Sequence, residues 1–199
     1  MPAVTQTRFF TTGSLAHPLR LRDGDYLPGV QIAYETWGEL NADRSNAIFL
    51  FHALSGSHHA AGFNPAIAGV GDLWQEEMHD GWWEAMIGPG KALDTDKYFI
   101  ICANYLGGCY GSTGPASQNP ATGKPWGSAF PAVTAADQVE VFAKSTSHRF
   151  DNWVSESSLR KINDRLIELS IIKPADAGAR PPFNPVSYTH LTLPTKRIV

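Results

Sequence analysis

The first part of the chain alternates between apolar and polar side chains in two short stretches. Leu19–Leu21 alternates up to the turn sequence Asp23-Gly24-Asp25, and Val30–Trp37 alternates throughout its length. A period of two places successive side chains on opposite faces of a strand. Two such stretches around a short turn predict an antiparallel edge hairpin over residues 19–37. Residues 1–18 show little periodicity and are predicted to form an extended arm.

Two later stretches, Asn46–Leu54 and Tyr98–Tyr105, are built on the unbroken apolar runs Ala47–Phe51 and Tyr98–Ala103. Unbroken apolar runs of this kind are typical of parallel strands that are buried on both faces. The segment between them is too long for a hairpin turn, so a right-handed crossover is expected. Within it, Gly81–Ile87 is predicted to form a short helix that ends at Gly88-Pro89-Gly90. An antiparallel edge followed by parallel strands predicts a mixed α/β sheet.

The pattern changes near Val139. Helical spacing continues beyond it and returns over Ser157–Leu169, but strands no longer alternate with helices. Ala175–Pro185 is rich in proline, glycine and alanine and is predicted to be disordered. We expect residues 1–139 to form part of an α/β domain. Residues 140–185 are either native sequence or a misjoined helical segment.

The composition is that of an ordinary globular domain. The chain has 199 residues, of which 43% are hydrophobic and 18% charged, and this length suffices for one domain with a core. The net charge of −3 gives no electrostatic case for binding nucleic acid or an anionic membrane. Cys102 is expected to be a packed thiol, and together with Cys109 it makes no disulfide framework. The N-terminus lacks a signal-peptide pattern and no apolar run is long enough to span a bilayer, so a cytoplasmic setting is expected.

A loop of unusual composition follows each apolar run. The first run breaks into a turn of small and polar residues at His52–Gly56, and the glycine-rich string Gly107–Pro115 follows the second. In an α/β-hydrolase sheet, one backbone N–H of the oxyanion hole lies in such a turn after a buried strand. The sequence has no Gly-x-Ser-x-Gly nucleophile elbow. The two loops therefore look like the front half of the active site of an acyl-transfer enzyme.

The segment from about Pro28 to Val139, slightly over half of the chain, resembles the homoserine O-acyltransferases of the α/β-hydrolase superfamily. The string Gly107–Pro115 is highly specific for this family. The other matching pieces are Ala33–Gly38, Asn46–Gly56, Gly81–Trp83, Ile87–Gly90, Leu93–Thr95, Asn119–Pro125 and Phe130–Pro131. The enzymes of this family acylate the side-chain hydroxyl of homoserine from acyl-CoA in methionine biosynthesis. Most use an acetyl donor, some use a succinyl donor, and a few related enzymes act on serine.

The resemblance implies roles for residues of the two loops. Leu54 occupies the position whose backbone N–H donates to the oxyanion. The substrate pocket is expected to include Ala53, Ser55, Gly56, Gly107 and Gly108. The family's serine, aspartate and histidine triad and its helical lid lie beyond the matching segment, and the elbow that would carry the serine does not occur in this chain.

We therefore expect a truncated α/β-hydrolase fold, in which the N-terminal half of the sheet is present and the nucleophile elbow and the lid are absent. The resemblance implies a parent enzyme that uses acyl-CoA, with acetyl favoured, and L-homoserine, needs no cofactor and forms a homodimer. The truncated chain is expected to be inactive. The alternatives are a non-catalytic α/β-hydrolase-like remnant with an interaction role, and another α/β-hydrolase that acts on esters.

The order of the last residues of the chain resembles that of a translated sequencing adapter. Val186–Thr195 is the translation of GTC TCT TAT ACA CAT CTG ACG CTG CCG ACG, which resembles a transposase-end adapter of sequencing libraries. We therefore expect residues 186–199 not to be natural protein sequence. The alternation of threonine and leucine in this stretch could otherwise pass for a strand.

Several histidines invite a catalytic or metal-binding interpretation. His52 lies at a strand end, where a hydrogen-bonded structural histidine that shapes the turn is favoured over a base. His58 and His59 are adjacent and would point apart on a strand, and the chain has no His-Glu-x-x-His pattern. A metal site is therefore not expected from the residues considered for it, which are His58, His59, His79, Asp72, Glu76 and Glu77.

None of the remaining candidates is expected to supply a nucleophile or a phosphate-binding loop. The sequence places no base beside Cys109, and Ser55 and Ser57 lack the flanking glycines of an elbow. Trp82 and Trp83 are expected to pack in the crossover. The second loop lacks the Gly-Lys-Ser/Thr ending of a phosphate-binding loop. Positive φ angles and close packing are therefore expected of Gly107, Gly108, Gly111 and Gly114.

Overall fold

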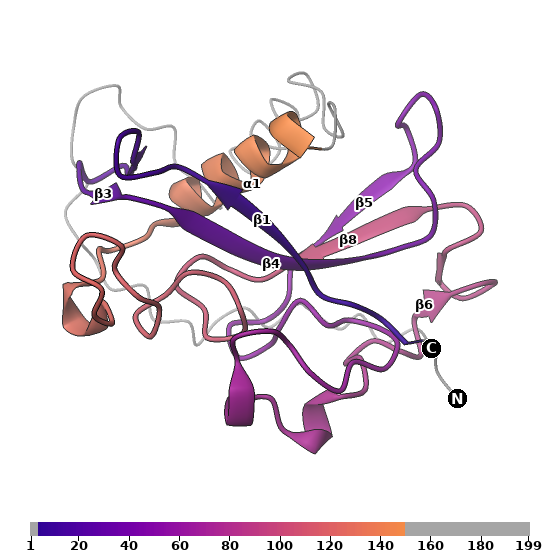
Figure 1. Ribbon diagram of the computed structural model, residues 1–199. Helices are drawn as coiled ribbons and strands as arrows, with labels where there is room; N and C mark the ends of the chain where they lie inside the picture. The colour runs from indigo at the N-terminus through magenta and orange to yellow at the C-terminus, as the bar shows by residue number, and fades with distance from the viewer. Residues whose placement is uncertain (1–3, 150–199) are drawn as a thin grey trace, which may run out of the picture. The chain divides into compact units, whose positions relative to one another are not determined.

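A four-stranded sheet with the strand order β1-β4-β8-β5 forms the centre of the computed structural model, which describes residues 4–149 (Figure 1). The strands are Arg8–Thr12 (β1), Val30–Trp37 (β4), Ala47–Leu50 (β5) and Phe99–Ala103 (β8). β4 is antiparallel to both β1 and β8, whereas β8 and β5 are parallel. This is the mixed α/β sheet that the sequence predicts.

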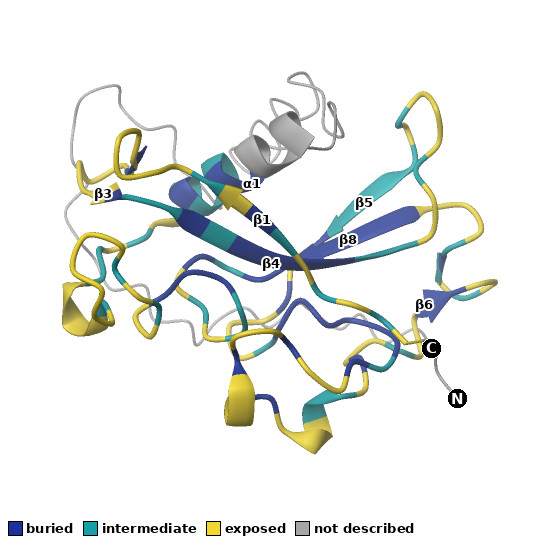
Figure 2. Ribbon diagram, viewed as in Figure 1, coloured by how far each residue is buried: buried dark blue, intermediate teal, exposed yellow. Residues whose placement is uncertain are grey.

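The two unbroken apolar runs form the parallel pair β5 and β8, so this prediction is confirmed. Every residue of β8 is buried; Ile100 and Cys102 pack in one core cluster and Ala103 packs in another. β5 is less well covered, and Phe51, just after it, is 57% exposed (Figure 2). Burial raises the pKa of the Cys102 thiol, so this residue is a packed, neutral thiol as expected.

The predicted hairpin over residues 19–37 is wrong. β4 pairs with β1 and lies inside the sheet, not at its edge. Leu19–Arg20 (β2) and Tyr26–Leu27 (β3) form a separate two-stranded ladder. Pro28 lacks a backbone N–H and Gly29 has a φ of +121°, so the ladder stops there and the chain changes direction before β4. The N-terminal arm thus contributes a strand that its periodicity does not reveal.

The predicted helix over Gly81–Ile87 is also wrong. The crossover between β5 and β8 consists of turns, two 3-10 helices and one short parallel pair. These elements are Gly71–Leu73 (η1), Glu76–Met78 (η2), Ile87–Gly88 (β6) and Leu93–Asp94 (β7).

Tertiary hydrogen bonds explain why no helix forms at Gly81. The Gly81 N–H donates to the Gly62 carbonyl (3.0 Å) and the Trp83 N–H donates to the Ala60 carbonyl (2.7 Å). These donors are therefore committed to a neighbouring segment and not to a helical ladder. A Cβ on Gly81 would lie 2.2 Å from the Ala61 Cα, so only glycine allows the two segments to approach this closely.

Helix α1, Ala135–Arg149, covers one face of the sheet, while the crossover and the loops cover the other (Figure 1). Its Val141 and Phe142 pack in one core cluster with Ile32 and Tyr34 of β4. The cluster on the other face consists of Leu50, Ala60, Ala61, Ile87, Ile100 and Cys102. The sheet is thus a layer with apolar contacts on both sides.

A capping box fixes the start of α1. The Thr134 Oγ1 accepts a hydrogen bond from the Asp137 N–H (3.3 Å), and the Asp137 carboxylate accepts one from the Thr134 N–H (2.8 Å). That carboxylate also accepts the Arg22 N–H (2.8 Å), and the Gln138 amide both donates to and accepts from the backbone of Leu106. The helix is thereby fixed to the loop that follows β8.

α1 continues without a break across the boundary expected after residue 139. The helix predicted over Ser157–Leu169, the disorder predicted over Ala175–Pro185 and the adapter-like residues 186–199 lie outside the described residues. They stay predictions, as does the division at residue 139. None of the helices in the described range combines the length and the apolar composition that crossing a bilayer requires.

Gly38, which follows β4, and Gly69 have nearly the same positive φ angle, +78° and +79°. A Cβ on Gly38 would lie 2.2 Å from the Tyr98 carbonyl oxygen, whereas nothing lies within 4 Å of a Cβ on Gly69. Alanine at either position carries left-handed strain of about 1 kcal/mol. We expect Gly38→Ala to lower the free energy of unfolding in urea by about 1–3 kcal/mol more than Gly69→Ala, because only Gly38→Ala displaces backbone. Equal losses would contradict this close approach.

Candidate active site at the carboxyl edge of the sheet

The turn after β5 and the glycine-rich loop after β8 lie at the same edge of the sheet. β5 and β8 are parallel neighbours, so their carboxyl ends meet where α/β proteins collect their binding sites. The Tyr105 hydroxyl donates to the His52 carbonyl (2.7 Å), and the two rings lie with their centroids 4.2 Å apart. The structure therefore brings together the two loops that the sequence singles out.

The turn after β5 presents a free backbone donor. It is closed by a hydrogen bond from the Gly56 N–H to the Ala53 carbonyl (2.8 Å). Leu54, at the second position of this turn, is 84% exposed, and its N–H makes no hydrogen bond to any residue between 4 and 149. Ala53 and Ser55 are exposed on either side of it. An oxyanion donor requires such an unpaired, accessible N–H.

His52 supports this turn from within. Its Nδ1–H donates to the Ala53 carbonyl (2.7 Å), and its Nε2 is buried without a partner among residues 4–149. Burial lowers the pKa of His52, although the bond to Ala53 acts in the opposite direction. A neutral ring that is bonded to its own turn has the structural role that the sequence predicts for it.

Backbone geometry accounts for the glycines of the second loop. Gly107 and Gly111 have φ angles of +93° and +91°, which favour glycine. A Cβ on Gly108 would lie 2.9 Å from the Tyr105 carbonyl oxygen, and a Cβ on Gly114 would lie 2.7 Å from the Gly108 carbonyl oxygen. The expected positive φ angles and close packing are thus confirmed, and Gly107 and Gly108 both reach the surface.

The same loop completes the sheet beside β4. The Ser112 hydroxyl accepts the Ala33 N–H (3.0 Å) and donates to the Asn104 carbonyl (3.1 Å), and the Thr113 hydroxyl accepts the Gln31 N–H (2.8 Å). The loop therefore supplies partners to the part of β4 that β8 does not reach. Because Ser112 is buried with its hydroxyl engaged twice, it is not an available nucleophile.

A buried polar network that the sequence analysis missed lies between β4 and the segment after the turn. Glu35 of β4 is fully buried, and its Oε2 lies 2.7 Å from the His59 Nδ1. Its Oε1 accepts hydrogen bonds from the Thr7 hydroxyl (3.0 Å) and the Asn64 amide (2.7 Å). The Nε2 of His58 lies 2.9 Å from the Thr7 Oγ1. Three separate segments thus meet at one carboxylate.

The two adjacent histidines of this network are in different electrostatic situations. Burial opposes charge on His59, but the hydrogen bond and the charge of Glu35 outweigh it and raise the pKa of His59. Burial lowers the pKa of His58 to about 4. The sequence analysis set both histidines aside because neighbours on a strand point apart. They lie in a loop instead, and the signal that could have found them is a glutamate within a buried strand.

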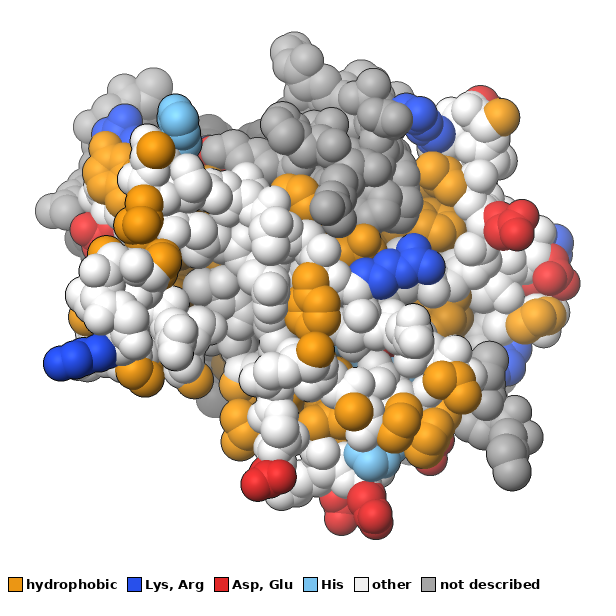
Figure 3. All heavy atoms as spheres, in the orientation of Figure 1, with side chains coloured by type: hydrophobic (Ala, Val, Ile, Leu, Met, Phe, Trp, Pro, Cys, Tyr) orange, Lys and Arg blue, Asp and Glu red, His pale blue; other side chains and the backbone are white. Residues whose placement is uncertain are grey.

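The other candidate residues are scattered. Asp72, Glu76 and Glu77 are exposed, and acidic side chains gather at the lower edge of the molecule, where η1 and η2 lie (Figure 3). His58 and His59 are buried, so the structure does not assemble these residues. In the part of the chain that the structure describes, no group of three or more such side chains could hold a metal ion.

The remaining side chains near the turn differ in exposure. Cys109 is exposed in the glycine-rich loop. Trp82 and Trp83 contact each other, with ring centroids 5.0 Å apart, and both are partly exposed. The Trp82 indole N–H donates to the Ser57 carbonyl (2.9 Å), so this part of the crossover is fixed to the end of the turn.

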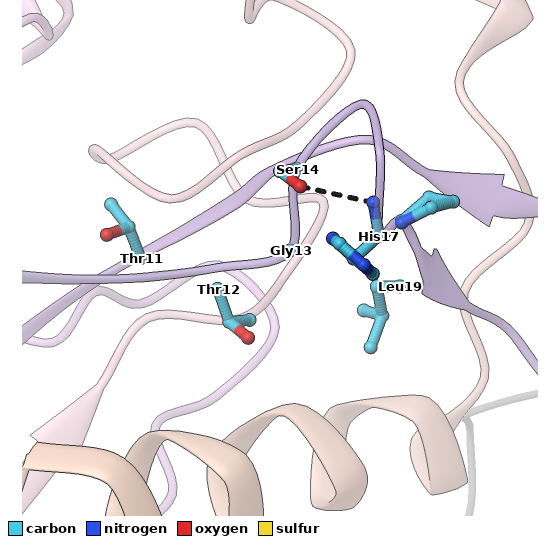
Figure 4. A pocket seen from close by; sticks show the side chains of 7 residues that line it. Thr11, Thr12, Gly13, Ser14, His17 and Leu19 are labelled. Atoms are coloured by element: carbon cyan, nitrogen blue, oxygen red, sulfur yellow. Dashed lines mark hydrogen bonds between the residues drawn. The ribbon is translucent and has the colours of Figure 1, made fainter.

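A cavity of about 510 Å³ lies elsewhere, beside the connection from β1 to β2 (Figure 4). The Ser14 hydroxyl at its rim accepts the His17 N–H (3.1 Å). Its lining consists of Thr11, Thr12, Gly13, Ser14, His17, Pro18 and Leu19. None of these belongs to the two loops, so the cavity is separate from the candidate site.

Comparison with curated proteins gives consistent relatives. The homoserine O-acetyltransferase of Methanosphaerula palustris is 59% identical over 131 residues, which are 66% of this chain and 25% of that protein. The homoserine O-succinyltransferase of Acidithiobacillus ferrooxidans is 52% identical over 145 residues, which are 72% of this chain and 36% of that protein. The chain thus spans between a quarter and about a third of the curated relatives it matches. No family model matches it.

Solved structures with the same arrangement of elements are also similar in sequence. A homoserine O-acetyltransferase from Bacillus anthracis superposes with a TM-score of 0.59 at 34% identity, over 72% of this chain and 36% of that chain. Esterase E22 superposes with a TM-score of 0.58 at 34% identity, over 72% of this chain and 37% of that chain. The fold described above therefore matches about a third of the length of each of these two chains.

Proposed function

We propose that this chain, a homologue of the homoserine O-acyltransferases with part of their α/β-hydrolase fold, is a segment of an acyltransferase. The whole enzyme would transfer an acyl group from acyl-CoA to the hydroxyl of L-homoserine. The observation that carries the proposal is the free, exposed N–H of Leu54 at the carboxyl end of a parallel strand, beside the glycine-rich loop. In this proposal the Leu54 N–H donates to the oxyanion that develops during acyl transfer.

Acyl transfer in the whole enzyme would proceed in two steps. A serine outside the matching segment gives its proton to the histidine of the triad and attacks the thioester carbonyl; the C–S bond breaks, and the CoA thiol leaves with that proton. The hydroxyl of homoserine then gives its proton to the histidine and attacks the acyl-serine ester; the ester bond to the serine breaks, and the proton passes to the serine oxygen. In each step the carbonyl oxygen becomes an oxyanion, to which the Leu54 N–H donates.

The small residues around Leu54 shape the pocket for the acyl group in this proposal. They are Ala53, Ser55, Gly56, Gly107 and Gly108. We favour an acetyl donor, although relatives with acetyltransferase and succinyltransferase names have comparable identities. The whole enzyme would need no cofactor beyond acyl-CoA as co-substrate, and would act in the cytoplasm as a homodimer.

An ester hydrolase is the second candidate, because esterase E22 is as similar in structure as the acetyltransferase. The same oxyanion donor would then serve a reaction with water as the acceptor. The identity of 59% to an acetyltransferase favours acyl transfer over hydrolysis. A non-catalytic remnant with an interaction role is the third candidate.

The proposal is tested by joining residues 1–139 to the part of the Methanosphaerula palustris relative that this chain does not cover. We expect the chimera to release thiol from acetyl-CoA or succinyl-CoA only when homoserine is present. Thiol release that is equally fast without homoserine would favour hydrolysis. Sequencing the genomic locus across the Val139 codon is the independent check, and a continuous reading frame with an elbow serine is expected.

Proline at position 54 isolates the backbone donor in this chimera. Leu54 is at the second position of a tight turn, which accepts proline, and proline has no N–H. We expect Leu54→Pro to lower kcat by about 10²–10³-fold. The matched control Leu54→Ala keeps the N–H and should retain most of the activity. Equal activity of the two variants would exclude Leu54 as a donor.

A further inference from the structure

The network around Glu35 lies next to the turn that presents the Leu54 N–H. His58 and His59 follow the turn directly, and His59 connects back to it because its N–H donates to the Ser57 hydroxyl (3.3 Å). The turn is therefore held at two ends. His52 and Tyr105 hold its first end, as described above, and Glu35 holds its second end through His59.

The hydrogen bonds of His59 define its protonation. Its Nε2 lies 2.9 Å from the His79 carbonyl oxygen, which can only accept, so this nitrogen carries a proton. Its Nδ1 faces the Glu35 Oε2 at 2.7 Å. Thr7 and Asn64 both donate to the other oxygen of Glu35. The hydrogen bond and the charge of Glu35 raise the pKa of His59, and this geometry favours an imidazolium that donates from both ring nitrogens.

His58 is the neutral counterpart. The single hydrogen of the Thr7 hydroxyl is directed to Glu35, so the His58 Nε2 must donate to the Thr7 oxygen. Its Nδ1 is left as a buried lone pair without a partner among residues 4–149. With His59 protonated, this imidazolium and the Glu35 carboxylate form a pair of opposite charges that is buried on both sides.

A buried charge pair costs desolvation free energy, and an apolar pair of the same volume would often be as stable. What the pair supplies is directional geometry, since an imidazolium between two acceptors fixes both the position and the orientation of its backbone. We propose that Glu35 and His59 are the positioning pair of the oxyanion turn, and hold residues 53–57 so that the Leu54 N–H stays outward and unpaired. This inference rests on the proposed function, because only that function makes the Leu54 N–H an oxyanion donor.

The groups that act on His59 come from several elements. Glu35 on β4 faces it directly, and Glu84 of the crossover carries the second nearby negative charge. His58 stands next to it in the chain, and the charges of both His59 and His52 act on His58. The carbonyl of His79 completes its shell. Of these groups, only Glu35 bonds to the His59 ring through a charged atom, so Glu35 is the residue to change.

The test is NMR spectroscopy of the full 199-residue chain with labelled histidine and backbone nitrogen. We expect both ring nitrogens of His59 to be protonated at neutral pH, with a titration midpoint above the ordinary value of 6.5. The amide signals of Leu54 and Gly56 should shift with the same midpoint. In Glu35→Gln the midpoint should fall below 6.5, and hydrogen exchange of the Gly56 N–H should accelerate about tenfold more than that of the Asn104 N–H, which reports on the sheet.

The control is Glu39→Gln, which removes an exposed carboxylate just beyond β4 and should change neither observable. Thr7→Val is the substitute variant if Glu35→Gln does not fold. It removes one hydrogen-bond donor to Glu35, so the titration midpoint of His59 should fall, but by less than in Glu35→Gln. A His59 midpoint below 6.5 in the unchanged chain would overturn the proposal. So would equal acceleration at Gly56 and Asn104, which is the result of a purely structural role.

These outcomes are independent of the outcome for the proposed function. The NMR measurements need no turnover, whereas the acyltransferase proposal fails if the chimera described above is inactive toward homoserine. If the chimera is active and the midpoint is below 6.5, the positioning pair is wrong and the function stands. If the chimera is inactive, but the midpoint is above 6.5 and exchange at Gly56 accelerates selectively in Glu35→Gln, the pair holds the turn and the function is wrong.

Discussion

The chain of 199 residues is expected to release no thiol from acetyl-CoA above background when homoserine is present. Acyl transfer at neutral pH requires an activated nucleophile, and the sequence contains no serine with the flanks of a nucleophile elbow. Loss of the nucleophile of a serine triad lowers kcat on the order of 10⁶-fold. An oxyanion hole without a triad leaves rates about 10³–10⁴ above those in water, which is far below a useful turnover.

The hydroxyl and thiol groups near the turn support this expectation. Ser55 is exposed and no described base is hydrogen-bonded to it, Ser112 is buried with its hydroxyl engaged, and Cys109 is exposed in a loop. The measurement is thiol release by the full chain next to the chimera as the positive control. Turnover comparable to that of the chimera, abolished by replacing Ser55, Ser112 or Cys109, would contradict the prediction and identify the nucleophile.

The sequence correctly predicts those strands whose residue pattern is explained by one structural situation alone. A strand buried on both faces must be apolar at every position, and β8 is such a strand. The hairpin over 19–37 fails because alternation identifies a strand but not its partner. The partner of β4 is β1, which is short and has no clear pattern. The helix over residues 81–87 fails because acceptors in the segment 59–62 take the first three N–H groups, those of Gly81, Trp82 and Trp83. A local pattern does not contain this information.

The sequence also predicts one part of the candidate site and misses another. The positions of the two loops follow from parallel strands and from glycine chemistry, so the sequence places Leu54 and Gly107 at one edge. The network of Glu35 depends on three segments that are far apart in the chain, namely Thr7, Glu35 and the residues around His59. No local pattern links them, and a glutamate within an alternating strand is ordinarily a solvent-facing residue. Only the assembled fold shows that this carboxylate is fully buried.

Replacing Glu35 with alanine is expected to lower the free energy of unfolding by about 3–5 kcal/mol, which is typical of removing one partner from a buried ion pair. The variant leaves the His59 ring without its acceptor and removes the acceptor of Thr7 and Asn64. Urea unfolding of both chains measures the difference. The matched control Glu39→Ala, at an exposed position, should stay within about 0.5 kcal/mol of the unchanged chain. Equal losses in the two variants would contradict the buried pair.

The pH dependence of stability separates the charge pair from mere loss of packing. The pKa of His59 is raised in the folded chain, so its contribution is fully present below pH 6.5 and is lost as the pH rises through the folded pKa. The pKa of His58 is lowered to about 4, so its contribution is full above pH 6.5 and is lost as the pH falls toward 4. Stability should therefore rise up to about pH 6.5 and then decline.

In Glu35→Ala the decline above about pH 6.5 should disappear, because burial without a carboxylate partner lowers the pKa of His59 and makes this residue behave as His58 does. Unfolding free energies measured between about pH 5 and pH 9 show both the rise of stability below about pH 6.5 and its decline above that pH. A loss of packing alone would lower the whole curve and keep its shape. If the unfolding free energy of Glu35→Ala still declines above about pH 6.5, another titrating group causes the decline. His59 would then not carry the proposed charge.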